Sequence, residues 1–248
     1  MVSRYEIVLH SLAVGDQRIL RYGHYGRPLL WFASDQGWAH DFENNGLLEA
    51  IGPLVDAGRT KVYCLDSYDA QSWRRNDLPL EERARLHQKF DDFVLYDVVP
   101  AIYADCQGRQ DIIVSGCSFG AYHAANFTLR RADLFPLAIC LSGMYDLGRI
   151  GWGERGNATY FNNPVDYVSH MHGDHLNWIR SRVYVLLVCG QGAWEDDSAS
   201  GSLSATKQFA AVLADKGIPH ELDLWGYDVA HDWPWWRKQL AHHLPRFV

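Results

Sequence analysis

Hydrophobic and polar positions follow two patterns along the chain. Residues 4–14 and 16–23 alternate in part on either side of Gly15-Asp16, which is typical of two strands joined by a tight turn. Further along, apolar residues form short continuous runs, as expected of strands that are buried on both faces of a sheet. These runs predict strands at 28–33, 61–65, 111–115, 135–142 and 182–189, and a last strand is expected at 220–225.

Helical patterns separate these runs. Apolar residues recur at helical spacing in several stretches between the predicted strands. Since strands alternate with helices after residue 28, the pattern predicts an α/β fold, with a mostly parallel, doubly wound sheet, an antiparallel start and helices on both faces. The predicted helices are 43–57, a charged amphipathic stretch from 79 to about 104, a helix directly after 118, 202–216 and 234–244.

The segment 144–181 interrupts this alternation. It is rich in Gly, Asn, Trp, Tyr and His and shows little periodicity, so we expect an irregular insert or a small cap. Its aromatic residues either line a pocket or pack the insert onto the rest of the protein. They are Tyr145, Trp152, Tyr160, Phe161, Tyr167 and Trp178. No linker or internal repeat divides the chain, which predicts a single domain over 1–248.

A possible nucleophile lies between the strand at 111–115 and the helix that follows it. The turn reads Gly116-Cys117-Ser118-Phe119-Gly120, a G-x-S-x-G pattern. In α/β-hydrolases this pattern holds a serine in a strained conformation at the carboxyl end of a parallel strand. The glycines are needed because side chains there collide with the neighbouring strand or helix. Ser118 is therefore the predicted nucleophile, and an idle serine in a glycine-lined turn is the alternative.

A serine hydroxyl needs a base to take its proton and a third group to orient that base. In α/β-hydrolases the order along the chain is Ser, acid, His, each after a different strand. Of the twelve histidines, His231 follows the last predicted strand by a short loop, whereas His123 is expected to pack within a helix. The acid should follow the strand 182–189, and we choose Glu195, with Asp196 as the reserve.

An oxyanion hole completes this arrangement. The backbone N–H of the residue after the nucleophile, Phe119, is one expected donor. The other should come from the loop after 28–33, where Gln36 and Gly37 are the candidates. Such donors stabilise the negative charge that develops on the substrate oxygen.

Composition narrows the possible partners. The chain of 248 residues is 48% apolar and has a net charge of −7 without a basic block, so nucleic acid is not an expected partner. The five cysteines have no metal spacing, and the histidines 170, 172 and 175 fit a polar loop better than a metal site. We expect no metal and no cofactor, and homo-oligomerisation stays open.

The same reading bears on localisation. No apolar run approaches the ~18 residues of a spanning helix, and no signal peptide is evident. Cysteines without a disulfide framework fit reduced thiols. We therefore expect a cytoplasmic protein that does not bind membranes.

Several segments together resemble the putative esterase family of α/β-hydrolases, most of all a branch of bacterial cytosolic esterases. The family includes S-formylglutathione hydrolases, feruloyl esterases and, more distantly, mycolyltransferases. The resemblance implies Ser118 as nucleophile and His231 as base. It gives less help with the acid, because many α/β-hydrolases carry Asp where this chain has Ala193. The segments are 63–69, 116–126, 141–146 and 231–236.

These features favour a serine carboxylic ester hydrolase that acts on small-molecule esters through an acyl-enzyme. Acyl transfer to another alcohol or a thiol is possible on the same three residues. A non-catalytic binding protein on the same scaffold is the third possibility, because a fold does not fix a function.

Overall fold

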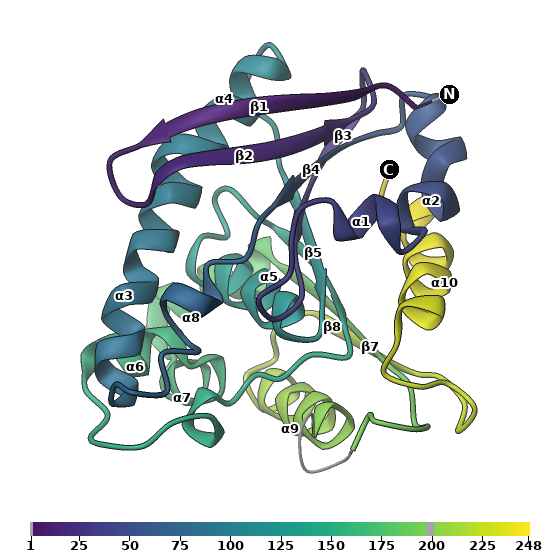
Figure 1. Ribbon diagram of the computed structural model, residues 1–248. Helices are drawn as coiled ribbons and strands as arrows, with labels where there is room; N and C mark the ends of the chain where they lie inside the picture. The colour runs from purple at the N-terminus through teal and green to yellow at the C-terminus, as the bar shows by residue number, and fades with distance from the viewer. Residues whose placement is uncertain (1, 197–200) are drawn as a thin grey trace.

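The computed structural model describes residues 2–196 and 201–248, and an eight-stranded sheet forms its centre (Figure 1). The order of the strands across the sheet is β1-β2-β4-β3-β5-β6-β7-β8. The strands are β1 Arg4–Ser11, β2 Gly15–Tyr22, β3 Arg27–Phe32, β4 Thr60–Leu65, β5 Ile113–Cys117, β6 Leu137–Leu141, β7 Tyr184–Cys189 and β8 His220–Leu224.

The pairing confirms a mostly parallel sheet with an antiparallel start. β1 pairs antiparallel with β2, β2 pairs antiparallel with β4, and every later pair is parallel. The carboxyl ends of β3 to β8 therefore lie along one edge of the sheet. Loops that leave this edge come together in open α/β sheets, which is where such folds bind ligands.

Helices cover both faces of the sheet (Figure 1). Together with the sheet, they confirm the predicted α/β class. The helices are α1 Asp41–Asn44, α2 Leu47–Asp56, α3 Leu80–Phe93, α4 Val99–Asp105, α5 Phe119–Arg130, α6 Asn157–Asn162, α7 Pro164–His170, α8 Gly173–Arg182, α9 Ser202–Asp215 and α10 Trp233–His243.

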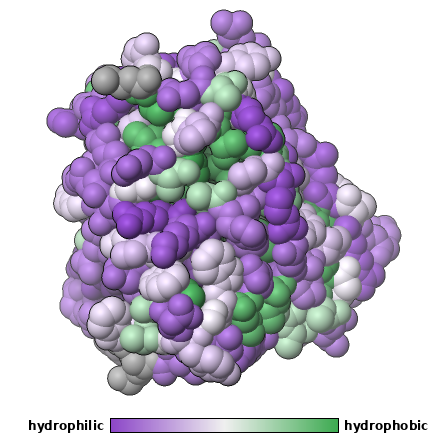
Figure 2. All heavy atoms as spheres, turned by 90° about the vertical axis from the view of Figure 1, so that its right-hand side faces the viewer, coloured by the Kyte–Doolittle hydropathy of each residue, from purple (hydrophilic) through white to green (hydrophobic). Residues whose placement is uncertain are grey.

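The apolar core has two parts, one on each face. Successive residues of a strand point to opposite faces, so Leu29 and Trp31 of β3 pack with α2 and α10, while Leu30 and Phe32 pack with α3 and α5. Both faces of the central strands β3 to β7 are buried, which explains why these strands read as continuous apolar runs. Polar residues cover most of the side that carries α2 and α10, with apolar patches among them (Figure 2).

Two predicted helices are divided in the structure. The stretch from 79 to 104 contains α3, a π-helical turn at Val94–Val98, and α4. Pro100 has no N–H to donate to the preceding turn, and the wider π turn precedes it. The stretch from 43 to 57 is split at Gly46, which has a φ of 78° and separates α1 from α2.

The prediction that 144–181 is irregular is wrong. The segment contains a 3₁₀ turn at Leu147–Arg149 and the helices α6, α7 and α8. Each helix is only six to ten residues long and buries two or three side chains, such as Leu176 and Ile179 in α8. Two turns are too few to display a helical period in the sequence.

None of the helices in 2–196 and 201–248 is long and apolar enough to cross a membrane. The same residues hold no group of three or more His, Cys, Asp or Glu side chains that could bind a metal ion.

Candidate active site

Ser118 lies at the turn between β5 and α5 and has an unusual backbone conformation. Its φ is 54° and its ψ is −121°, a region that non-glycine residues rarely adopt. Such a conformation costs about 1–3 kcal/mol and persists only where the surroundings enforce it. Here the Ser118 N–H donates to the carbonyl of Leu141 at 2.8 Å, which ties the turn to the end of β6.

The two glycines of the motif make this turn possible. A Cβ on Gly120 would lie 2.4 Å from the carbonyl oxygen of Phe32 and 2.6 Å from that of Ala33. A Cβ on Gly116 would lie 2.5 Å from the carbonyl of Gly120. Atoms cannot approach so closely without moving the backbone. The glycines therefore allow β3, β5 and α5 to meet at Ser118.

The structure brings Ser118, His231 and Glu195 together. His231 Nε2 lies 3.1 Å from Ser118 Oγ, and His231 Nδ1 lies 3.0 Å from Glu195 Oε2. The three residues follow β5, β8 and β7, so they meet at the carboxyl edge of the sheet. Each contact is within hydrogen-bond distance.

Glu195 is the acidic residue of its loop that reaches His231. Its side chain is fully buried, whereas the reserve, Asp196, is exposed and accepts a hydrogen bond from the Ser204 N–H at 3.0 Å. Asp197, the third carboxylate of the run, lies outside the described residues.

Donors compensate the buried charge of Glu195. Its Oε1 accepts hydrogen bonds from Ser142 Oγ at 2.7 Å and from the Gly190 N–H at 3.1 Å. Ser142 Oγ in turn accepts from Trp236 Nε1 at 3.1 Å. A buried carboxylate needs such partners, because desolvation is costly for a charge without them. Sequence reasoning missed Ser142 and Trp236, although both lie in segments that carry the family resemblance.

Backbone hydrogen bonds join the loops of the acid and the histidine. The His231 N–H donates to the Ala193 carbonyl at 2.9 Å, and the Gly192 N–H donates to the Val229 carbonyl at 2.9 Å. The position where many α/β-hydrolases carry Asp thus contributes a backbone carbonyl here. The carboxylate comes from Glu195, two residues later in the same loop.

Of the two candidates in the loop after β3, Gly37 already has an acceptor for its N–H. It donates to the Ser34 carbonyl at 2.8 Å and closes a turn. Gln36 occupies that turn with a φ of 54°. Phe119 is the first residue of α5, where backbone N–H groups have no acceptor within the helix. Phe119 and Gln36 are therefore the two backbone donors that remain from the sequence prediction.

Four aromatic residues of the insert pack in the core or line a cavity away from Ser118. Tyr145 is buried and stacks on Phe209 at 4.4 Å. Others line a cavity of about 440 Å³ at the opposite end of α5, around Arg130, and its lining includes neither Ser118 nor His231. These are Tyr160, Phe161 and Tyr167, with the histidines 170, 172 and 175.

Comparisons with known proteins give matches at the level of family and fold. A family model described as putative esterase matches residues 30–247. A search of curated proteins finds no match. Among solved structures, a ferulic acid esterase shares 17% identity, covers 99% of this chain and 97% of its own, and has a TM-score of 0.75.

Two further structures are similar over nearly their whole length. The S-formylglutathione hydrolase of Staphylococcus aureus shares 14% identity, with coverage of 99% of this chain and 96% of that one and a TM-score of 0.69. MPT51 of Mycobacterium tuberculosis shares 15% identity, with coverage of 98% and 97% and a TM-score of 0.76. At these identities the structural likeness shows the fold alone. The family model matches most of the chain and therefore shows the family as well. The chain has the α/β-hydrolase fold of these structures, and it belongs to the putative esterase family.

Proposed function

We propose that this protein hydrolyses carboxylic esters of small molecules through an acyl-enzyme on Ser118. The observation that carries the proposal is the continuous chain of contacts from Ser118 Oγ to His231 Nε2 and from His231 Nδ1 to Glu195. A nucleophile, a base and an orienting acid in this order are the parts that acyl transfer needs. We also propose that the whole chain forms one domain around this site.

In the first half of the reaction, Ser118 Oγ attacks the ester carbonyl carbon while His231 Nε2 takes its proton. The carbonyl oxygen becomes an oxyanion, which the N–H groups of Phe119 and Gln36 stabilise. The C–O bond to the alcohol then breaks, and His231 gives its proton to the leaving oxygen. Glu195 keeps the ring oriented and stabilises its protonated form.

In the second half, water replaces the alcohol. The water oxygen attacks the acyl carbon while His231 takes a proton from the water. His231 then gives that proton to Ser118 Oγ as the bond to the acyl group breaks and the acid leaves. If an alcohol or a thiol attacks in place of water, the result is acyl transfer. The same residues take part, and the same bonds and protons are exchanged. The acceptor that reaches the acyl-enzyme decides between the two outcomes.

The test combines a covalent probe with a series of p-nitrophenyl esters from acetate to octanoate. A fluorophosphonate should label wild-type protein and fail to label Ser118→Ala. Ester hydrolysis should fall by ~10³ or more in both Ser118→Ala and His231→Ala, as expected of residues that act as a unit. His242→Ala, an exposed histidine of α10, is the control and should keep wild-type rates.

Each outcome assigns a function. Labelling with hydrolysis supports the esterase, and the best chain length then measures the acyl pocket. Labelling without hydrolysis, but with ester exchange when alcohols are added, supports an acyltransferase. Wild-type protein that does not react with the probe contradicts both and favours a binding protein.

A further inference from the structure

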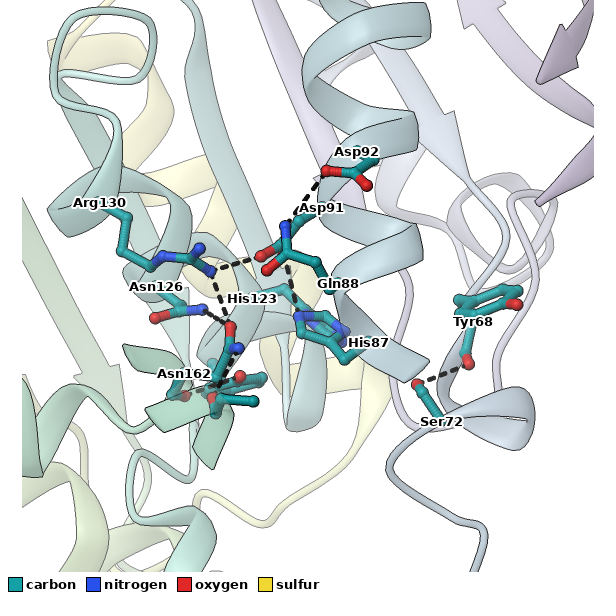
Figure 3. A network of polar contacts seen from close by, with 12 residues as sticks. Tyr68, Ser72, His87, Gln88, Asp91, Asp92, His123, Asn126, Arg130 and Asn162 are labelled. Carbon is teal, nitrogen blue, oxygen red and sulfur yellow. Dashed lines mark hydrogen bonds and ion pairs between the residues drawn. The ribbon is translucent and has the colours of Figure 1, made fainter. Parts of the chain in front are cut away.

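Polar side chains are buried between α3 and α5, behind the turn that carries Ser118. Figure 3 shows His87 of α3 and His123 of α5 lying between these helices. His87, Asp91, His123 and Asp69 each expose at most 3% of their side chains. The proposed mechanism uses none of them. Burying a charge costs folding free energy unless the charge is paired, so the partners of these four side chains decide what their burial costs.

The cluster contains two carboxylate–histidine pairs with different connections. His87 Nε2 lies 3.3 Å from Asp91 Oδ1, and both residues belong to α3. His123 Nε2 lies 3.0 Å from Asp69 Oδ1, and this pair joins α5 to the loop after β4. The His87–Asp91 contact lies within α3, although Asp91 also forms an ion pair with Arg130 of α5. The His123–Asp69 contact links two segments that are 54 residues apart.

Asp69 is held on both of its oxygens. Its Oδ2 accepts a hydrogen bond from Ser67 Oγ at 2.5 Å, while the Asp69 N–H donates to the same hydroxyl at 3.0 Å. Burial alone raises the pKa of Asp69, but attraction and hydrogen bonding from His123, with the Ser67 hydroxyl, outweigh it and lower the pKa. The carboxylate is thus a charged anchor for His123, five residues after Ser118 on α5.

The same loop holds the turn that contains Gln36. The Ser67 N–H donates to the Gly37 carbonyl at 2.9 Å, and Asp66 Oδ1 accepts from the Ala39 N–H at 2.7 Å. We call residues 34–38 the oxyanion loop. A path of hydrogen bonds therefore runs from His123 through Asp69 and Ser67 to the oxyanion loop.

The oxyanion loop needs this support because it lies beyond the sheet. The register of β3 with β5 ends at Phe32 and Gly116, so sheet pairing fixes only the base of the loop. A second connection, at the surface, runs from Asp35 to Arg74 at 2.8 Å, and Arg74 lies 5.2 Å above the ring of Phe119. Both connections reach the oxyanion loop through residues 66–74.

We propose that Asp69 and His123 are positioning residues that hold the Gln36 N–H in register with the Phe119 N–H. The inference rests on the proposed function, because it assigns these two donors to the oxyanion hole. Donors must lie about 2.7–3.1 Å from the developing oxyanion, and a misplacement of ~1 Å can cost ~10²-fold in rate. The pair acts on the transition state through the loop and never touches the substrate.

The two carboxylates provide a matched test. Asp69→Asn and Asp91→Asn each remove one buried charge next to a buried histidine, but only Asp69 connects to the oxyanion loop. Three quantities are measured for each variant: kcat and KM on the best p-nitrophenyl ester, the inhibition constant of an alkyl boronic acid, and Tm. The boronic acid forms a tetrahedral adduct on a reactive serine and so reports on the oxyanion hole.

We expect Asp69→Asn to lower kcat by ~10–10²-fold and to weaken boronate inhibition by a similar factor, with KM within ~3-fold of wild type. Asp91→Asn should lower Tm and leave kcat and boronate inhibition within ~3-fold. His123→Gln should behave like Asp69→Asn. If Asp69→Asn does not fold, Ser67→Ala removes the hydroxyl that joins Ser67 to Asp69 and keeps the Ser67 N–H that donates to Gly37, so it should reproduce the fall in kcat to a smaller extent.

Two results overturn the proposal in distinguishable ways. Equal kcat and boronate effects in Asp69→Asn and Asp91→Asn, or loss of Tm alone in both, reject the positioning role while the esterase stands. Wild-type protein that does not react with a fluorophosphonate at Ser118 rejects the proposed function, and the positioning role with it.

Discussion

At the scale of single residues, burial distinguishes Glu195, which contacts His231, from its neighbour Asp196. Glu195 Oε2 lies 3.0 Å from the ring, and its Oε1 is held by Ser142 and Gly190. Asp196 is exposed and accepts a hydrogen bond from the Ser204 N–H. Glu195 and Asp196 are both carboxylates, but the first is buried and the second is exposed. Substituting each in turn can therefore show which of them supports His231.

Glu195→Gln keeps the shape of the side chain but removes its charge. The amide can donate a hydrogen bond to Nδ1 and so favour the wrong tautomer of His231, which in a comparable triad lowers kcat by ~10⁴. We expect a fall of ~10³ or more in ester hydrolysis at pH 7.5. Asp196→Asn is the control and should stay within ~2-fold of wild type, since surface substitutions rarely matter. Comparable losses in both variants would show that the loop as a whole, rather than one carboxylate, supports His231.

The sequence allowed Ser118 and His231 to be predicted because each follows a recognisable strand at a fixed place. It ranked Glu195 above Asp196 only weakly, since adjacent carboxylates in a loop look alike. What distinguishes them is Ser142 Oγ, which lies 53 residues earlier in the chain. The pair of Asp69 and His123 could not be predicted for the same reason, because no local pattern relates residues so distant.

At the scale of elements, close packing of β3, β5 and α5 explains the G-x-S-x-G motif. Gly120→Ala would place a Cβ 2.4 Å from the Phe32 carbonyl oxygen, so the start of α5 must shift. Overpacking of this kind costs about 1–3 kcal/mol in the free energy of unfolding, and we expect activity to fall as well, because Phe119 moves with the helix. Urea unfolding and p-nitrophenyl ester hydrolysis measure the two effects.

Gly52→Ala is the matched control for Gly120→Ala. Gly52 lies in α2, and a Cβ there would meet no atom within 4 Å. Alanine is favoured over glycine in a helix by about 0.8–1.0 kcal/mol, so this variant should be more stable than wild type and equally active. If both variants lose stability, crowding at Ser118 is not the reason for the effect at Gly120.

The sequence predicted the strands well because a sheet buried on both faces produces continuous apolar runs. It did not reveal the three short helices of 157–182, since each buries only a few side chains and a start signal such as Asn163-Pro164 does not predict a helix without a following apolar period. α7, for example, begins at Pro164 and buries only Pro164, Tyr167 and Val168. Tertiary packing, rather than local periodicity, specifies these elements.

At the scale of the whole molecule, the interior holds ionisable groups whose protonation is linked to folding. Burial lowers the pKa of His87 and outweighs the attraction of Asp91, and burial also lowers the pKa of His243. Asp69 and Asp91 have lowered pKa values, because attraction and hydrogen bonding outweigh burial: from His123 and Ser67 for Asp69, and from His87 and the Arg130 guanidinium for Asp91. All four shifts make the native state bind fewer protons than the unfolded chain when the pH falls.

These shifts make the free energy of unfolding decrease as the pH falls. A histidine whose pKa is lowered on folding contributes its full stability above the unfolded value of about 6.5, and this contribution is lost as the pH falls below that value. One such group changes the free energy of unfolding by up to ~1.4 kcal/mol per pH unit. The lowered aspartates extend the loss below about pH 4. Stability should therefore decrease from pH 7.5 to pH 5.5 in urea unfolding.

His87→Gln should make this decrease smaller, because glutamine cannot take up the proton that the unfolded wild-type chain gains. His172→Gln is the control, since His172 is exposed, and it should keep the wild-type dependence. For each protein, the free energy of unfolding at pH 5.5 is subtracted from that at pH 7.5. A lower stability of His87→Gln at both pH values therefore does not affect the comparison. If the differences for wild type and His87→Gln are equal, His87 is not the group that couples acid to unfolding, and His243 becomes the next residue to substitute.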